Sequence, residues 1–299
     1  MDNANIEYNI NHGVLYIVAT PIGNLDDASV RVKSVLSSVD YILAEDTRRT
    51  AKLLSQFSIK TPMQSFHDHN ESERISDVIS LLEDGNNLAL VSDAGTPLIS
   101  DPGYKLVKAL HQYHFKVVPV PGACALITAL SVSGIATDKF SFEGFLPSKK
   151  QARLSALNEY KNGLLGDRTL VFYESPHRIL ASLADMLEVL REGQEITIAR
   201  ELTKTYESLY VGQLKDVYST VNSALNHQKG EFVIVLSGKS FVSDKRQNLD
   251  SISSQSQQIL NILLTELSVK QAVSLAVKMT GEKKKKLYAA ALAMVENKT

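Results

Sequence analysis

The first half of the chain alternates short apolar runs with longer segments in which apolar residues recur every three or four positions. The apolar runs have the length of buried strands, and the periodic segments have the pattern of amphipathic helices. Strands that alternate with helices predict βαβ units around a parallel sheet. We expect strands at residues 14–19, 41–44, 63–66, 88–91 and 116–120, and helices at 27–38, 47–57, 71–83, 101–113 and 121–134.

The pattern changes after residue 140. Two apolar runs between residues 195 and 212 follow each other with no helical segment between them, which predicts a mixed sheet in the second half. We expect strands at residues 140–147, 169–175, 196–202, 206–212 and 230–238, and helices at 149–160, 176–190 and 213–225.

The last part of the chain differs again in composition. A polar, serine-rich stretch predicts a linker, and the helical pattern that follows it breaks at "MTGEKKKK". Two amphipathic segments joined at "TG" resemble a helix-turn-helix. The predicted organisation is an α/β domain at 1–122, a second α/β domain at 123–240, a linker at 241–257 and a helical tail at 258–299.

Composition narrows the class of protein. The 299 residues carry a formal net charge of -1, so any RNA contact has to come from a local basic patch. Cys124 is the single cysteine, which excludes disulfides within the chain and cysteine-built zinc sites. No apolar run approaches the roughly 20 residues of a membrane span, and the start "MDNANIEYNINHG" lacks the pattern of a signal peptide. We expect a cytoplasmic protein with no membrane contact.

Candidate chemistry lies in the loops that follow the predicted strands. These loops read "ATPIGNLDD", "AEDTRRT", "FHDHNE" and "SDAGTPLISDPG", and the chain contains neither G-x-G-x-x-G nor G-x-x-x-x-G-K-[ST]. Ligands of open α/β sheets bind at the carboxyl ends of strands, and prolines and glycines specify the shape of such loops. The loops hold more acid than base, which favours a ligand with hydroxyl groups and positive charge over a triphosphate.

Together with "PVPGACALITALSVSG" and "FYESPHR", these loops resemble the tetrapyrrole methylase superfamily, and within it the branch of ribosomal RNA small-subunit methyltransferase I. The resemblance implies two α/β domains with S-adenosylmethionine bound in the cleft between them, a helical tail and a homodimer. It also implies 2′-O-ribose methylation of a cytidine, cytidine 1402, in the 16S RNA of the small ribosomal subunit. Two alternatives stay open: a tetrapyrrole or other small-molecule methylase, and a non-catalytic protein that binds RNA or the cofactor. The basic tail argues against a small planar substrate.

The resemblance also assigns cofactor contacts, residue by residue. One departure is Thr96, which stands where the wider superfamily has an aspartate, so the contact expected there moves to Asp93. The implied contacts are Pro21, Asp93, Ala94, Gly95, Thr96, Ile99, Cys124, Ala125 and Glu174.

Methyl transfer to a ribose hydroxyl needs alignment and a group that accepts the proton of the hydroxyl. The candidates for this chemistry are Glu45, Asp46, Arg48 and His67. Each has a structural alternative: the two acids favour the start of a helix that Thr47 would cap, and the histidine can be an ordinary hydrogen-bonded side chain. His67 and His69 lack further ligands for a metal site, so we expect no metal.

Local patterns also predict where helices begin. Ser100 or Asp101 would cap the helix that begins within "SDPG", with Pro102 in its first turn, and Asp101 stays open between this cap and a functional role. Ser175 would cap the helix that starts at Pro176. The basic residues near 200–204 and the lysine run 283–286 suit either RNA phosphates or an ordinary solvated surface.

Overall fold

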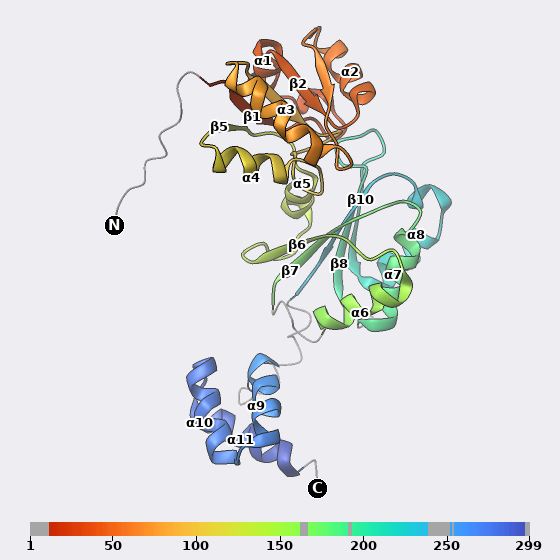
Figure 1. Cartoon of the computed structure of the whole chain (residues 1–299). Helices are drawn as coiled ribbons and strands as arrows, with labels where there is room; N and C mark the ends of the chain where they lie inside the picture. The colour runs from red at the N-terminus through yellow and green to blue at the C-terminus, as the bar shows by residue number, and fades with distance from the viewer. Residues whose placement is uncertain (1–11, 162–166, 191–192, 239–251, 253, 297–299) are drawn as a thin grey trace. The chain divides into compact units, whose positions relative to one another are not determined.

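The computed structural model describes residues 12–161, 167–190, 193–238, 252 and 254–296. By their contacts the residues form two compact units. The first consists of Met1–Thr128 together with Glu201–Glu207, and the second of Ala129–Arg200 together with Ser208–Thr299. The fold combines α/β units with a helical C-terminal region, as the sequence predicts (Figure 1).

The described part of the first unit is built on a five-stranded sheet whose strand pairs are all parallel. The strand order is β3-β2-β4-β1-β5. Because the strands are parallel, their carboxyl ends meet at one edge of the sheet. The strands are β1 (Val14–Val18), β2 (Tyr41–Ala44), β3 (Met63–Ser65), β4 (Leu88–Val91) and β5 (Lys116–Val120).

Helices cover both faces of this sheet, and successive strand residues point to opposite faces. Ile42 packs in one apolar cluster with Leu36 of α1, whereas the next residue, Leu43, packs in another with Leu82 of α3 and Leu106 of α4. This two-sided burial explains why the central strands β2 and β4 are apolar without interruption. The elements are η1 (Leu25–Asp27), α1 (Val30–Ser38), α2 (Thr47–Gln56), α3 (Glu71–Glu83) and α4 (Tyr104–Gln112). Helix α5 (Ala125–Val132) begins in the first unit and ends in the second.

Helix α4 begins later than the sequence predicts. Its N-cap is Gly103, at φ 126°, with no side-chain cap of its own, so the prediction of Ser100 or Asp101 as N-cap is wrong. The cap comes instead from the buried Glu71, whose Oε1 accepts hydrogen bonds from the backbone N–H of Lys105 (2.9 Å) and of Leu106 (3.2 Å). A residue 34 positions away thus satisfies donors that the helix start leaves unpaired.

The second unit contains a mixed sheet, which confirms the prediction from the two adjacent apolar runs. In the described residues its order is β6-β7-β10-β8-β9, with β6 and β7 parallel and the other pairs antiparallel. Phe172, Leu183 and Ile234 lie in its core. The elements are β6 (Phe140–Phe145), α6 (Lys150–Lys161), β7 (Thr169–Glu174), α7 (Ile179–Val189), β8 (Glu195–Arg200), β9 (Ser208–Gln213), α8 (Leu214–Asn222), η2 (Leu225–Gln228) and β10 (Phe232–Leu236).

Helix α7 begins at Ile179, with Arg178 as N-cap. The prediction that Ser175 caps this helix is wrong, because residues 175–178 form a turn before it. The carbonyl of Ser175 accepts hydrogen bonds from the backbone N–H of both Arg178 and Ile179, each at 3.1 Å.

The described tail folds around its own apolar cluster, which includes Leu260, Val273 and Leu287. It holds α9 (Ser254–Glu266), α10 (Val269–Thr280) and α11 (Lys284–Glu296), so α9 begins inside the segment expected as a linker. Most of that predicted linker lies outside the described residues. Gly281 ends α10 at φ 70° and donates its N–H to the carbonyl of Val277 (2.9 Å), which explains the break at "TG". Among the described residues, no helix is both long enough and apolar enough to cross a bilayer.

Candidate functional site

The loops that follow β1, β4 and β5 are tied to one another at the carboxyl edge of the first sheet. Thr20 and Gly95 exchange backbone hydrogen bonds of 2.8 and 3.0 Å. The hydroxyl of Thr20 also donates to the carbonyl of Ser92 (3.4 Å), and that of Thr96 donates to the carbonyl of Ala123 (3.0 Å). Three of the predicted ligand loops therefore form one connected structure.

The loop after β4 has an unusual backbone. Gly95 (φ 86°) and Gly103 (φ 126°) adopt positive φ, and so do Leu98 (φ 73°) and Ser100 (φ 66°), which are not glycines. Left-handed backbone at such residues costs free energy and persists where the surroundings fix it, often at functional sites. A Cβ at Gly95 would lie 3.4 Å from Cγ2 of Ile22, an ordinary van der Waals contact, so glycine is favoured here by the backbone conformation.

Carboxylates from neighbouring loops converge at the same edge. Oε2 of Glu45 accepts a hydrogen bond from the N–H of Asp93 (3.3 Å), and Oδ1 of Asp93 accepts one from the N–H of Asp46 (3.1 Å). Arg49 forms an ion pair with Asp93 at 3.1 Å. Burial raises the pKa of Glu45, and the charges of Asp93 and Asp68 raise it further.

Asp101 belongs to this carboxylate cluster as well. Burial, chiefly, raises its pKa to about 7, with the charges of Glu45, Asp93 and Asp68 adding to the shift and a hydrogen bond from Ser92 opposing it. The sequence left Asp101 open between capping and function, and the cap of α4 comes from elsewhere. Asp68 and Ser92 were not predicted as site residues. Their positions in the strand-end loops "FHDHN" and "VSDAG" are the sequence feature from which they could have been predicted.

Asp46 and Arg48 have a different environment. Asp46, not Thr47, is the N-cap of α2, and its Oδ1 accepts from the N–H of Arg48 at 2.9 Å. The guanidinium of Arg48 donates to both carboxylate oxygens, at 3.1 and 2.7 Å. These hydrogen bonds hold the pKa of Asp46 well below its usual range. A carboxylate that binds its proton so weakly is a poor base.

His67 lies just after β3, and its N–H donates to Oδ1 of Asn70 at 2.8 Å. Its ring meets that of His69 edge-on, with ring centroids 5.9 Å apart. The buried Nδ1 of His67 has no hydrogen-bond partner among the described residues. Within the described ranges, no three His, Cys, Asp or Glu side chains gather to hold a metal ion.

The remaining predicted cofactor residues fall into two groups. Pro21, Ala94, Ile99, Cys124 and Ala125 lie in the first unit: Ala94 is exposed, the others are half-buried, and Ala125 is the first residue of α5.

Glu174 lies in the second unit, at the end of β7. Its buried carboxylate accepts hydrogen bonds from the hydroxyl of Ser182 (2.6 Å) and the N–H of Ser175 (2.8 Å), and pairs with Arg178 (2.7 Å). These partners tie the carboxylate to the turn at 175–178.

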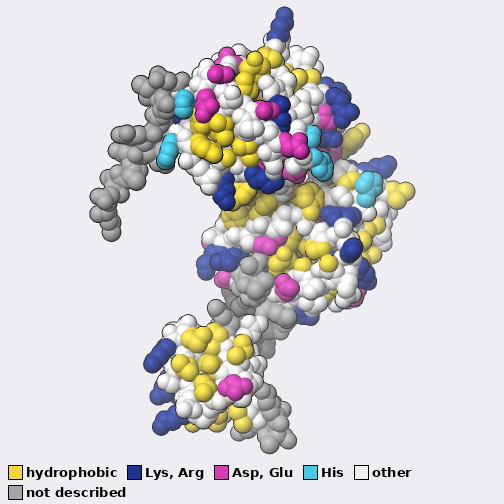
Figure 2. Space-filling model, in the orientation of Figure 1, with side chains coloured by type: hydrophobic (Ala, Val, Ile, Leu, Met, Phe, Trp, Pro, Cys, Tyr) yellow, Lys and Arg dark blue, Asp and Glu magenta, His cyan; other side chains and the backbone are white. Residues whose placement is uncertain are grey.

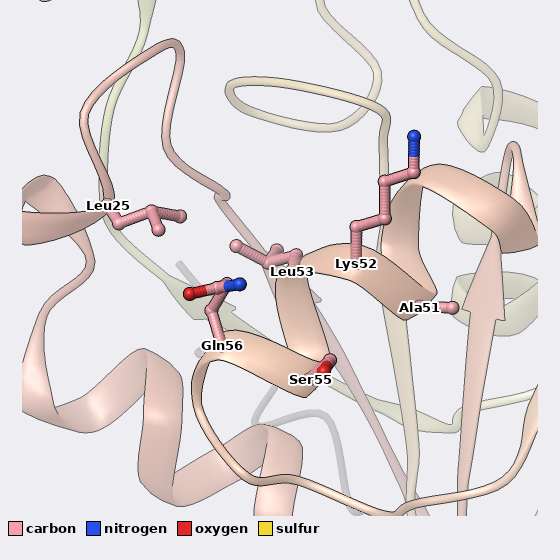
Figure 3. Close-up of a pocket in the computed structure, with 6 residues that line it drawn as sticks. All are labelled: Leu25, Ala51, Lys52, Leu53, Ser55 and Gln56. Carbon is pink, nitrogen blue, oxygen red and sulfur yellow. The ribbon is translucent and has the colours of Figure 1, made fainter.

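Two surface features lie outside the strand-end loops. A shallow pocket on the outer side of α2 is lined by apolar and polar side chains from η1 and α2 (Figure 3). It contains none of the predicted site residues; the lining residues are Leu25, Ala51, Lys52, Leu53, Ser55 and Gln56. On the tail, hydrophobic side chains cover much of one face, and Lys or Arg side chains stand along its edge (Figure 2).

A parallel sheet with shaped loops and converging carboxylates at its carboxyl edge defines an α/β protein with a small-ligand site at the strand ends. The family model described as Tetrapyrrole (Corrin/Porphyrin) Methylases matches residues 14–218, and one described as the RsmI C-terminal HTH domain matches residues 250–294. The chain belongs to the tetrapyrrole methylase family, in the branch of the ribosomal RNA small subunit methyltransferases I.

Relatives named "Ribosomal RNA small subunit methyltransferase I" match nearly the whole chain. That of Haemophilus influenzae is 48% identical, with 95% of this chain and 98% of the relative covered. The one of Pseudomonas aeruginosa is 46% identical, with 94% and 97% covered. Two solved structures share the fold at 18% identity: the methyltransferase CobJ (TM-score 0.55, 75% of this chain and 94% of that one) and uroporphyrin-III-C-methyltransferase from Thermus thermophilus (TM-score 0.51, 78% and 98%).

Proposed function

We propose that this protein transfers a methyl group from S-adenosylmethionine to the 2′-oxygen of a cytidine, cytidine 1402, in the 16S RNA of the small ribosomal subunit. One observation carries this proposal. The similarity to rRNA methyltransferases extends over 92–95% of the chain in five relatives and includes the tail, which the tetrapyrrole methylase model, ending at residue 218, does not cover. We further propose that the enzyme acts in the cytoplasm as a homodimer.

The strand-end loops of the first unit suit this cofactor. S-adenosylmethionine carries positive charge on its sulfonium and ammonium groups, and hydroxyls on its ribose. Glu45, Asp93 and Asp101 present acidic oxygens at the loop edge, and Gly95 leaves room for a ligand to approach the backbone. The residues that would hold it are Pro21, Asp93, Ala94, Gly95, Thr96, Ile99, Cys124 and Ala125.

When bound, S-adenosylmethionine supplies a methyl group on a sulfonium leaving group, so the protein has to align the ribose oxygen and take up its proton. Glu45 fits the second task better than Asp46 does. Its pKa is raised, which makes the carboxylate more basic, whereas the pKa of Asp46 is lowered by Arg48.

The tail suits a large polyanionic substrate. Lys283, Lys284 and Lys285 are exposed at the start of α11, and Lys286 is half-buried. Lysines bind phosphate as point charges, which gives affinity without sequence choice. In this proposal the tail supplies affinity for RNA, and the strand-end loops supply the chemistry.

A second candidate is a small-molecule methylase, since the solved structures of similar fold include tetrapyrrole enzymes. The same fold hosts several activities, so this likeness concerns the fold alone. A test supplies the purified protein with S-adenosylmethionine labelled in the methyl group and offers three acceptors: small ribosomal subunits from a strain lacking the modification, the naked 16S RNA, and a tetrapyrrole. We expect label in the RNA. Label in the tetrapyrrole, or binding of RNA with no transfer at all, would contradict the proposal.

A further inference from the structure

The segment Glu201–Glu207 follows β8 and precedes β9 in the chain, yet its contacts place it in the first unit. Its backbone is strained, because Glu201 (φ 51°) and Thr203 (φ 65°) both adopt the left-handed region. For a β-branched residue such as threonine this conformation is a genuine outlier. Strain of this kind persists where the surroundings hold it, and it clusters at functional sites.

What holds the segment is the loop after β1. The backbone N–H of Asn24 donates a hydrogen bond to Oγ1 of Thr203 at 3.1 Å. The neighbouring Gly23 packs so closely that a Cβ there would lie 2.8 Å from the same oxygen and 2.4 Å from Cγ of Lys204. It would also lie 3.0 Å from the carbonyl oxygen of Leu202. Glycine is thus required at position 23 by the approach of this segment.

The same loop is fixed at its other end by the paired backbone hydrogen bonds between Thr20 and Gly95. Pro21 and the buried Ile22 lie between these two attachments. The short loop predicted to contact the cofactor is therefore held at both ends, once within the sheet edge and once by Thr203.

The rest of the segment stabilises its own turn. The N–H of Thr203 donates to Oε2 of Glu207 at 2.6 Å, and Nζ of Lys204 pairs with Oε1 of Glu201 at 2.8 Å. With its backbone N–H bound within the segment, Thr203 presents its hydroxyl oxygen to Asn24.

We propose that Thr203 is a positioning residue of the methyl-donor site: its hydroxyl, by accepting from Asn24, fixes the loop that carries Pro21 in the conformation that binds S-adenosylmethionine. This rests on the proposed function, which assigns that loop to the cofactor. A loop held in its bound shape loses less entropy on association, so affinity rises without a direct contact from Thr203.

Three substitutions of Thr203 distinguish a role in positioning the cofactor loop from a role in stability alone. Thr203→Val removes the acceptor at nearly constant volume and keeps the β-branch, Thr203→Ser keeps the acceptor, and Thr203→Gly removes both the acceptor and the backbone strain. Thr205→Val, at an exposed position of the same segment, is the matched control. Each full-length variant is titrated calorimetrically with S-adenosylmethionine, assayed for methyl transfer to small subunits, and melted to check its fold.

The hydrogen bond between Asn24 and Thr203 sets the size of the expected effect, which is roughly a fivefold loss of affinity for S-adenosylmethionine. Thr203→Val and Thr203→Gly should raise both Kd and KM for S-adenosylmethionine by about that factor and leave kcat at saturation unchanged. Thr203→Ser and Thr205→Val should match the wild type, and Thr203→Gly should melt no lower than the wild type although it binds more weakly. Wild-type affinity in a folded Thr203→Val, or an equal loss in Thr203→Ser, would overturn the assignment of Thr203. A wild-type protein that does not bind S-adenosylmethionine would instead overturn the proposed function.

Discussion

Gly95, in the loop after β4, adopts a backbone conformation that favours glycine. Its φ of 86° is unfavourable for any other residue, and the space beside it lies against Ile22 in the loop proposed to bind the cofactor. We expect Gly95→Val to weaken S-adenosylmethionine binding by well over tenfold, that is by more than roughly 1.4 kcal/mol. Calorimetric titration measures this directly.

Gly134→Ala is the control for Gly95→Val. Gly134 has a similar φ of 70°, but open space surrounds the position where a Cβ would stand. Gly134→Ala should lower the unfolding free energy through backbone strain alone and leave the affinity for the cofactor unchanged. If Gly95→Val folds and binds as the wild type does, the loop after β4 is not part of the cofactor site.

Glu45 and Asp46 are adjacent acids whose environments differ. The pKa of Glu45 is raised and that of Asp46 is lowered, so Glu45 is the better suited of the two to take up a proton. Glu45→Gln should lower kcat by about 10²-fold or more with little change in affinity for S-adenosylmethionine. Asp46→Asn keeps an oxygen that can cap the helix and loses only the exposed ion pair with Arg48, so turnover should stay close to that of the wild type. If Glu45→Gln and the wild type have equal turnover at saturating cofactor, Glu45 does not take up the proton and its role is structural.

Asp101 should make stability fall as pH rises. An unfolded aspartate ionises near its ordinary pKa of 3.8, whereas in the folded protein the pKa is about 7. Between these values the folded state holds an extra proton, so raising the pH favours the unfolded state. Asp101→Asn cannot ionise. The unfolding free energy of the wild type minus that of Asp101→Asn should therefore decrease from about pH 4 to pH 7 and then level off.

Urea unfolding of both proteins across this pH range measures that difference. A difference that is flat with pH, or that increases, would show that burial and the neighbouring carboxylates do not disfavour the charged form of Asp101.

At the scale of elements, helix α4 depends on a side chain from α3. Glu71 is 4% exposed and accepts from two N–H groups at the start of α4. Glu71→Ala leaves these donors unpaired in the protein interior and should cost about 2 kcal/mol of unfolding free energy. Glu73→Ala, at an exposed acidic residue in the same helix turn, is the control and should cost far less. Equal unfolding midpoints in urea for Glu71→Ala and Glu73→Ala would refute the capping role.

Elements whose limits depend on neighbouring residues were predicted well from the sequence, and elements whose limits depend on distant residues were not. Strands β2, β4 and β5 begin and end at the predicted residues, and in β2 and β4 almost every residue of the run is buried. The starts of α4 and α7 were misplaced because serine and proline patterns report only local capping. In α4 the cap is supplied by Glu71, and before α7 the residues of the expected first turn form a separate turn.

In the candidate site, too, some features follow from the sequence and others depend on contacts between distant residues. That the loops after parallel strands share one edge follows from topology, so Glu45, Asp93 and Gly95 could be grouped from sequence. The contact between Thr203 and Asn24 joins residues 179 positions apart, and no local pattern predicts it. The raised pKa of Asp101 likewise depends on Glu45, Asp93 and Asp68, which come from separate loops.

For the whole molecule, the net charge of -1 leaves the tail as the clearest local source of RNA affinity. Changing the four lysines 283–286 to serine should leave cofactor binding intact and weaken binding to the small subunit. The slope of log affinity against log salt should flatten by about 0.7–0.9 for each RNA phosphate that a lysine no longer neutralises. A control with Lys52, Lys60, Lys108 and Lys116 changed to serine removes the same charge from exposed positions of the first unit. If both variants give the wild-type slope, the lysine run is an ordinary solvated surface.

The proposed reaction methylates a single oxygen atom of the RNA, the 2′-oxygen of one ribose. Alkaline cleavage of RNA requires a free 2′-hydroxyl, so a 2′-O-methyl group protects the bond that follows the modified nucleotide. Undermethylated small subunits are incubated with the protein and S-adenosylmethionine, and the extracted 16S RNA is partially hydrolysed in alkali and mapped to single nucleotides. We expect one new gap in the cleavage ladder, at cytidine 1402. An uninterrupted ladder from RNA that has nevertheless gained a methyl group would place that group on a base and contradict 2′-O-methylation.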